Sequence, residues 1–285
     1  MRHLWSAGRV QRWRVGDVEV VRIVDDEVAL PPDALAAGWS APLPGWIEPR
    51  FATDAGVLLA FSALAIRAAD GTRLVVDPWL VNDAARTRDG AAEHVDGLLA
   101  RLASAGFPAD DVDTVVLSHI DGVGWITRPS STPPGWGPTF PRARYLLAHD
   151  ERERWRAGPE AEQLDVLEAA GQLELVDRSD PVEVLAPGVT LEAAPGHSAG
   201  HLAVRIESGG RLALYAGHLF LTPLQVADPS IPNDEEPQLA SGVRFAVLGE
   251  LAERHGLLLT TIVGGPGGGL VHEAWDGPGY RLEPI

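Results

Sequence analysis

The residues best suited to chemistry follow a short apolar stretch in the middle of the chain. Residues 114–117 are apolar or β-branched and predict a buried strand, and a polar run opens at Ser118. His119 and Asp121 therefore lie at a strand end, where folds usually place functional side chains. Because imidazole titrates near neutral pH and carboxylates orient imidazoles or bind cations, this pair predicts acid/base or metal chemistry.

The composition excludes several kinds of catalysis. The 285-residue chain contains no cysteine, which excludes disulfides, thiolate nucleophiles and Cys-ligated zinc. All 23 basic residues are arginine, and the absence of lysine excludes Schiff-base chemistry. The side chains that remain for catalysis are those of His, Asp, Glu, Ser, Thr, Tyr and Arg.

The charge balance argues against an anionic macromolecular partner. The formal net charge is −17, whereas binding to phosphate groups requires clustered basic side chains. We therefore expect a small-molecule substrate and neither a nucleic-acid nor a membrane partner. No apolar run reaches the length of a membrane span, and the N-terminal residues lack the apolar core of a signal peptide. The sequence predicts a cytoplasmic protein.

Periodicity predicts the elements around His119. Residues 57–67 and 73–76 predict a β-hairpin that ends at Asp77. Apolar residues at helical spacing predict a helix over 94–106, directly before the strand that leads to His119. Residues 128–141 contain so much Pro, Gly and Ser that we expect an irregular loop there.

The second half of the chain repeats this alternation. The charged run 150–156 predicts a solvated helix start, with a helical stretch to about Ala170. An amphipathic helix is expected over 239–251, ended by His255 and a capping glycine at Gly256. Further strands are expected at residues 145–148, 173–176, 189–193, 202–206, 212–215 and 257–263.

No linker-like change in composition divides the chain. We therefore interpret residues 1–285 as one domain of two αβ halves with their sheets face to face. A strand over 18–24 leads into the segment 30–50, which is rich in Pro, Gly and Trp. This segment is a candidate lid or extension.

Six segments together resemble the metallo-β-lactamase fold hydrolases, nearest their lactonase and organophosphate-hydrolase-like branch. In order along nearly the whole chain they are LVVDPWLVND, DVDTVVLSHIDGVGW, PTFPRARYLLAHDERERW, APGHSAGHLAVRI, LYAGHLFLTPLQVADP and LLLTTIVGGPGGGLV. The resemblance implies an α/β (α+β) fold, a four-layer αββα sandwich with its active site at the strand ends along one edge.

The resemblance also implies which residues stand at the metal-ligand positions. At the first motif of the family, HxHxDH, His119 matches the leading histidine and Asp121 the aspartate, whereas Gly122 stands at a histidine position. In PGHSAGH, His197 matches a ligand, and His201 corresponds to a position that looks structural.

The last two ligand positions depart from the family. The Gly-Asp whose aspartate bridges two metals corresponds to Gly217-His218, and the final ligand histidine corresponds to Ile262. Too few ligands remain for two ions, because each needs about four. The expectation is therefore no metal, or one divalent ion (Zn, Fe or Mn) at His119, His197 and His218.

The chemistry open to the site depends on this metal. Coordination lowers the pKa of bound water from about 15.7 to about 7, whereas a positioned general base contributes roughly 10²- to 10⁴-fold in rate. A metal-free site suits proton transfer next to a carbonyl or hydrolysis of an activated ester. His119, Asp121, His197 and His218 are the candidate catalytic residues, and the candidate substrate pocket comprises Trp79, Trp125, Ser198 and Ile262.

One further motif has a second interpretation. The sequence GHSAG matches the GxSxG nucleophile elbow, which would make Ser198 a nucleophile. The elbow must lead into a helix, however, and the following residues HLAVRI alternate as a strand does. We therefore expect no elbow. The glycine-rich run 264–269 opens no helix either and predicts a flexible turn.

Three functions remain open from the sequence. The preferred one is a diverged enzyme without the dinuclear centre that performs His/Asp acid-base catalysis on a carbonyl-bearing small molecule, in secondary metabolism. The reaction would be a cyclisation, dehydration, isomerisation or activated-ester hydrolysis. The alternatives are a mononuclear metal-dependent hydrolase of a lactone, ester or thioester, and a non-catalytic small-molecule binding protein. The family resemblance adds the expectation of a homodimer.

Overall fold

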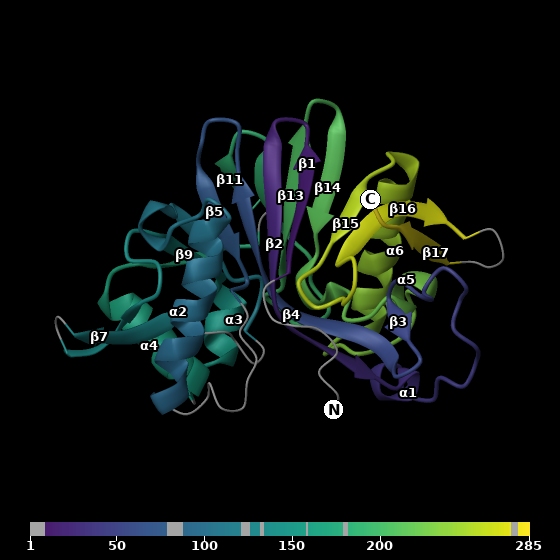
Figure 1. Cartoon of the computed structure of the whole chain (residues 1–285), viewed down its shortest axis with the longest axis horizontal. Coiled ribbons are helices and arrows are strands. Elements are labelled where there is room, and N and C mark those ends of the chain that lie inside the picture. The colour runs from purple at the N-terminus through teal and green to yellow at the C-terminus, as the bar shows by residue number, and fades with distance from the viewer. Residues whose placement is uncertain are drawn as a thin grey trace.

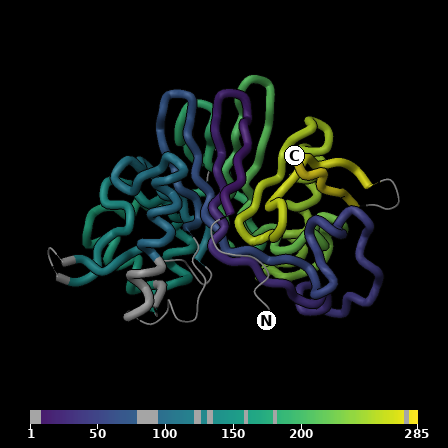
Figure 2. The backbone as a smooth tube through the Cα atoms, in the orientation of Figure 1, coloured from purple at the N-terminus to yellow at the C-terminus, as the bar shows by residue number. Residues whose placement is uncertain are grey.

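Two mixed β-sheets, formed by consecutive halves of the chain, lie face to face in the centre of the molecule (Figure 1). The structure is a computed structural model that describes residues 9–78, 88–120, 126–131, 134–157, 159–178, 182–274 and 279–285. Figure 2 follows the chain from the first sheet and its helices to the second.

The first sheet has the strand order β1-β2-β4-β5-β6-β9-β10, with β3 paired to β4. Its strands pair antiparallel from β1 to β5, and β5, β6, β9 and β10 pair in parallel. The bounds are β1 (Val10–Val15), β2 (Val18–Leu30), β3 (Ala52–Thr53), β4 (Gly56–Arg67), β5 (Arg73–Val76), β6 (Thr114–Val116), β9 (Arg144–Ala148) and β10 (Leu173–Val176).

The second sheet runs in sequence order from β11 to β17, and only β14 and β15 pair in parallel. Its strands are β11 (Glu183–Ala186), β12 (Val189–Ala193), β13 (Leu202–Ser208), β14 (Arg211–Tyr215), β15 (Leu257–Leu259), β16 (Gly268–Glu273) and β17 (Tyr280–Glu283). The described helices are α1 (Pro32–Leu35), α2 (Arg88–Ser104), α3 (His149–Arg154), α4 (Pro159–Ala169), α5 (Leu224–Ala227) and α6 (Pro237–Glu253), with 3-10 turns η1 (Ala109–Asp111) and η2 (Gly217–Leu219).

Alternation along the strands creates the layers. In β4, Leu64 and Ile66 point into the apolar core between the sheets, whereas Ala63 and Ala65 belong to the core under α2. On the other side, Leu251 of α6 packs with residues of the second sheet. Helices therefore cover both outer faces, and the predicted αββα sandwich is confirmed (Figure 1).

Most predicted elements are present, but the proposed irregular loop is wrong. Residues 127–138 form a two-stranded sheet of β7 (Thr127–Ser131) and β8 (Pro134–Pro138), in which Pro129 pairs with Trp136. In a two-stranded sheet each strand has one unpaired edge. A proline whose nitrogen faces that edge removes no hydrogen bond between the strands. Local composition could not reveal this pairing.

The end of α6 also differs from the prediction. His255 takes the left-handed conformation with φ 49°, and the Gly256 N–H donates to the Leu251 carbonyl at 2.7 Å. A Cβ on Gly256 would lie 2.5 Å from Leu251 Cδ2, so a larger residue there would displace the buried Leu251 side chain. The strand expected over 257–263 ends at Leu259, and β1, β11, β16 and β17 were not predicted.

The segment 30–50 packs against the body of the protein. Ile47 within it and Phe51 directly after it are fully buried, and the Trp46 ring meets the Phe51 ring edge-on with centroids 5.7 Å apart. Trp39 is half-buried against the same core. A lid role for this segment stays a prediction. Within the described residues, no helix is long and apolar enough to cross a membrane.

We expect Leu64→Ala to lower the free energy of unfolding by about 2–5 kcal/mol, because it leaves a cavity between the sheets. Urea unfolding followed by circular dichroism measures this loss. Val184→Ala is the control, since Val184 is 66% exposed and its truncation should change stability by less than about 0.5 kcal/mol. Equal losses in the two variants would contradict the assignment of the inter-sheet core.

Candidate metal centre

Histidines from three loops meet where strands of both sheets end. His119 follows β6, His218 follows β14, and His197 lies in the loop between β12 and β13. Their rings lie close together, with centroids 4.4 Å apart for His119 and His218 and 5.1 Å apart for His119 and His197. Because β5, β6, β14 and β15 end at the same edge of the sandwich, residues distant in sequence become neighbours.

Asp77 and Ser118 orient His119. The Asp77 carboxylate accepts hydrogen bonds from the Ser118 N–H at 2.8 Å and from the Ser118 hydroxyl at 2.5 Å. Since that hydroxyl donates to the carboxylate, Ser118 Oγ accepts from His119 Nδ1 at 2.9 Å. This arrangement places the proton of His119 on Nδ1 and leaves an electron pair on Nε2.

His119 faces His218 directly. His119 Nε2 and His218 Nδ1 are 2.9 Å apart, so His218 donates and His119 accepts. Burial, followed by the nearby imidazoles, holds the pKa of His119 well below its usual value. The His119 ring is therefore neutral, the state in which imidazole binds a metal ion.

Gly217 permits the close approach of these side chains. Its φ is +51°, and a Cβ there would lie 2.5 Å from His201 Nε2 and 2.8 Å from Ser118 Oγ. His201 is fully buried, and its Nε2 accepts the His218 backbone N–H at 3.2 Å. His201 thus has the structural role expected from the sequence, since it fixes the backbone at His218.

His197 is oriented from its outer side. Its Nδ1 lies 3.2 Å from the Asn233 carbonyl and 3.4 Å from Asp234 Oδ1, which are both acceptors. The proton of His197 therefore sits on Nδ1. Burial alone would raise the pKa of Asp234, but hydrogen bonds with His197 and Arg244 outweigh burial and hold that pKa below its usual value.

The three histidines fit one metal ion. One ring nitrogen from each of His119, His197 and His218 lies within 4.8 Å of the others. Tetrahedral coordination with bonds of about 2.0–2.1 Å separates ligand nitrogens by about 3.3 Å. Small side-chain shifts satisfy this spacing, and an ion would take the place of the 2.9 Å hydrogen bond between His119 and His218. Neutral imidazoles suit zinc and iron among other divalent ions.

A buried carboxylate joins the two motif loops. Glu151 of α3 is fully buried and accepts from the Ile120 N–H at 3.1 Å, the Gly200 N–H at 3.3 Å and the Ser198 hydroxyl. The solvated interpretation of the charged run 150–156 is therefore wrong at Glu151. Its neighbours on the helix are charged, so the sequence carried no signal for its burial.

The structure also excludes the nucleophile elbow. Ser198 is fully buried, its hydroxyl donates to Glu151, and the loop leads into the strand β13 as expected. Its place in a substrate pocket stays a prediction. Trp79, Asp121, Gly122 and Trp125 lie outside the described residues, and their assigned roles stay predictions.

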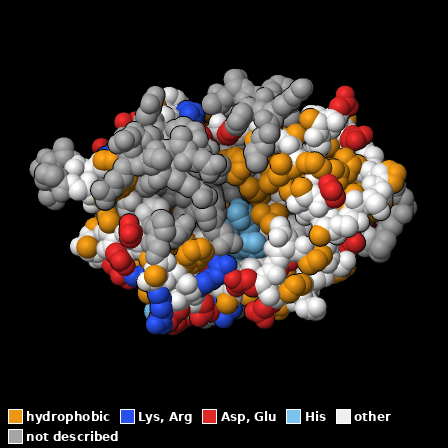
Figure 3. Space-filling view, turned by 90° about the horizontal axis from the view of Figure 1, so that it is seen from below, with side chains coloured by type: hydrophobic (Ala, Val, Ile, Leu, Met, Phe, Trp, Pro, Cys, Tyr) orange, Lys and Arg blue, Asp and Glu red, His pale blue; other side chains and the backbone are white. Residues whose placement is uncertain are grey.

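Ile262 lies in an apolar cluster with Val28 and Leu59. The fully buried Arg22 holds this loop, because its Nη2 donates to the Thr261 carbonyl at 3.1 Å and to the Val263 carbonyl at 2.7 Å. Burial lowers the pKa of Arg22 to about 9. In Figure 3, hydrophobic side chains gather beside the histidines on the face seen from below.

Several residues of the site were not predicted. Tyr215 donates to Asp77 Oδ2 at 2.5 Å, and burial followed by the Asp77 charge raises the pKa of Tyr215 well above its usual value. The signal for Tyr215 was its position two residues before Gly217-His218 at a strand end. Asp234 and Arg244 lie on a loop and a helix with no motif, so their contacts could be found only in three dimensions.

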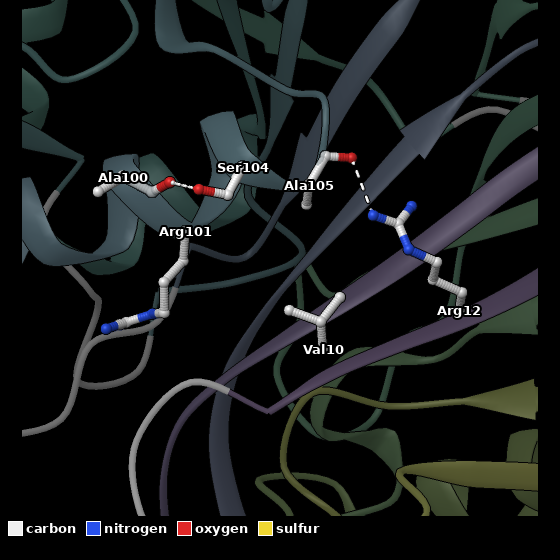
Figure 4. A pocket seen from close by; sticks show the side chains of 6 residues that line it. All are labelled: Val10, Arg12, Ala100, Arg101, Ser104 and Ala105. Atoms are coloured by element: carbon white, nitrogen blue, oxygen red, sulfur yellow. Dashed lines mark hydrogen bonds between the residues drawn. The ribbon is translucent and has the colours of Figure 1, made fainter.

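Arg12 of β1 and Arg101 of α2 line a hollow of about 400 Å³ (Figure 4). Arg12 pairs with Glu19 at 2.7 Å, and Arg101 pairs with Asp25. The two guanidinium groups are therefore already neutralised by carboxylates.

Comparisons with known proteins identify the fold. No protein-family model matches the chain, and no curated protein matches it significantly. Among solved structures, the hydrolase AbOPH in the beta lactamase superfamily has 20% sequence identity and a TM-score of 0.73, covering 99% of each chain. AidC, a dizinc quorum-quenching lactonase solved with a product, has 19% identity and a TM-score of 0.75, covering 98% of each chain.

A probable metal-dependent hydrolase from Staphylococcus aureus matches at 17% identity with a TM-score of 0.69, covering 96% of this chain and 99% of that one. The chain therefore has the fold of the metallo-β-lactamase superfamily hydrolases, as the sequence motifs predicted. At these identities the likeness establishes the fold.

We expect Gly217→Ala to destabilise the protein by about 1–3 kcal/mol more than Gly210→Ala, measured by urea unfolding. Both glycines have positive φ (+51° and +74°), but a Cβ on Gly210 meets nothing within 4 Å. The difference between the variants therefore isolates the crowding against His201 and Ser118. Equal destabilisation would show that Gly217 matters only for its backbone conformation.

Proposed function

We propose that this protein is a hydrolase of a lactone, ester or thioester that works with one divalent cation held by His119, His197 and His218. The observation that carries the proposal is the convergence of three buried imidazoles within 4.8 Å, two of them oriented by acceptors on Nδ1. Two proteins of similar fold, the dizinc lactonase AidC and the probable metal-dependent hydrolase from Staphylococcus aureus, favour the same chemistry. This proposal reverses the preference for a metal-free site drawn from the sequence.

The proposal is for one ion because Ile262 offers no ligand. The apolar cluster of Ile262, Val28 and Leu59 would contact an apolar part of the substrate. A divalent cation supplies Lewis acidity and lowers the pKa of a bound water molecule. The protein's own contribution is to hold neutral imidazoles in one orientation, through Asp77 and Ser118 at His119 and through Asn233 and Asp234 at His197.

We expect protein purified without chelator to contain close to one equivalent of zinc, iron or manganese per chain, measured by inductively coupled plasma mass spectrometry. His218→Ala removes one of three ligands and should reduce the metal content by at least about tenfold. His149→Ala is the matched control, because the His149 side chain is 54% exposed at the start of α3.

Hydrolysis of a panel of lactones, aryl esters and thioesters should follow the metal content of these variants. Wild-type protein that neither contains metal nor takes up added zinc, iron or manganese would overturn the proposal.

A metal-free acid-base enzyme is the second candidate, and one observation favours it. Hydrogen bonds run without a gap from Asp77 through Ser118 and His119 to His218, with heavy-atom distances of 2.5, 2.9 and 2.9 Å. Such a chain can pass a proton between its ends while the carboxylate stabilises a charged imidazole.

Chelation separates the two candidates. For the metal-dependent hydrolase, we expect dialysis against a chelator to abolish turnover and zinc, iron or manganese to restore it. Turnover that persists in protein shown to be metal-free would favour the acid-base enzyme and contradict the first proposal.

A further inference from the structure

Arg244 of α6 lies fully buried behind the histidine cluster. Its Nη2 donates to both carboxylate oxygens of Asp234, at 2.6 and 2.5 Å. The same carboxylate lies 3.4 Å from His197 Nδ1, so a continuous contact runs from the helix to a proposed ligand.

The same guanidinium also holds the loop of a second histidine. Arg244 Nε donates to the carbonyl of Leu219, the residue after His218, at 2.6 Å. Its Nη1 donates to the carbonyls of Pro229 and Ile231, at 3.3 and 3.2 Å, in the segment that leads to Asp234. One side chain therefore contacts both loops that position proposed ligands in the second half of the chain.

We propose that Arg244 is a positioning residue that couples His197 and His218. Through Asp234 it fixes the ring orientation and the Nδ1–H tautomer of His197, and through Leu219 it fixes the backbone next to His218. This role rests on the proposed function, because Arg244 would arrange His197 and His218 as metal ligands before the cation binds.

The chemistry of guanidinium explains why arginine occupies this position. Its planar group donates in several fixed directions at once, whereas an ammonium group is a point charge with three rotatable donors. Four acceptors on two chain segments surround Arg244: the Leu219 carbonyl on one, and the Pro229 and Ile231 carbonyls and the Asp234 carboxylate on the other. Lysine would keep the positive charge but could not satisfy these acceptors together. Arg244→Lys therefore changes the hydrogen-bond geometry at this position while it keeps the positive charge.

The NMR signals of the histidine rings in metal-free protein test this role without an activity assay. Imidazole ¹⁵N chemical shifts distinguish protonated from unprotonated ring nitrogens, and the His197 signals are assigned by their loss in His197→Gln. In the wild type we expect the Nδ1–H tautomer, since Nδ1 faces two acceptors. In Asp234→Asn the amide turns its oxygen to Arg244 and presents a donor to His197, so the population of this tautomer should fall.

Affinity for zinc is the second measurement, made by competition with a coloured chelator. We expect Arg244→Lys and Asp234→Asn each to weaken zinc binding by roughly 10- to 100-fold, the usual effect of removing a partner that orients a ligand. Arg205→Lys is the matched control. Arg205 also binds a carboxylate of α6, with its Nη2 2.7 Å from Glu250 Oε2, but it does not contact the histidine loops.

The outcomes separate this inference from the proposed function. Wild-type tautomers and zinc affinity in both site variants would overturn the positioning role. A changed His197 tautomer in the site variants, with the wild-type tautomer kept in Arg205→Lys, supports the positioning role. This holds even if the wild type binds no metal, and in that case only the proposed function fails. Because Asp234→Asn keeps Arg244 in place, it decides the question should Arg244→Lys fail to fold.

Discussion

The Asp77 carboxylate connects the two sheets at the edge where the histidines meet. It is almost fully buried, and it accepts hydrogen bonds from Ser118 after β6 and from Tyr215 at the end of β14. A buried carboxylate without such partners would cost several kcal/mol, so the donors must stay in place. Asp77 itself adopts a positive φ of 41°, a conformation that non-glycine residues keep only where the surrounding contacts enforce it. The position of His119 depends on this arrangement, because Ser118 joins the carboxylate to the ring.

Around this carboxylate, the histidines are held by contacts on their outer sides. Ser118 contacts His119, Asn233 and Asp234 contact His197, and His201 accepts the backbone N–H of His218. Each contact comes from a different loop or strand end, so the geometry of the cluster belongs to the whole sandwich. His218 brings a third imidazole next to His119 and His197, with ring centroids 4.4 and 5.5 Å from theirs.

The sequence pattern predicted those elements whose formation depends on residues that are neighbours along the chain. The strand-like stretches 57–67 and 73–76 predicted the hairpin, and the structure shows β4 and β5 as an antiparallel pair. The β7–β8 pair was missed because its stability comes from pairing across an edge, which proline and glycine content does not reveal. Glu151 was misjudged because a charged run gives no sign of which member faces inward. Its burial depends on three donors from loops distant in sequence.

The amino-acid sequence alone predicts the strand ends that carry His119 and His218, and the order of its motifs predicts the αββα sandwich. These features depend on residues that are neighbours along the chain, and the periodicity of apolar residues reveals them. Two features could be found only in three dimensions: ring nitrogens of His119, His197 and His218 lie within 4.8 Å of one another, and Asp234 and Arg244 lie behind His197. Convergence depends on how two sheets pack and where their parallel strands end, and no spacing along the chain records those distances.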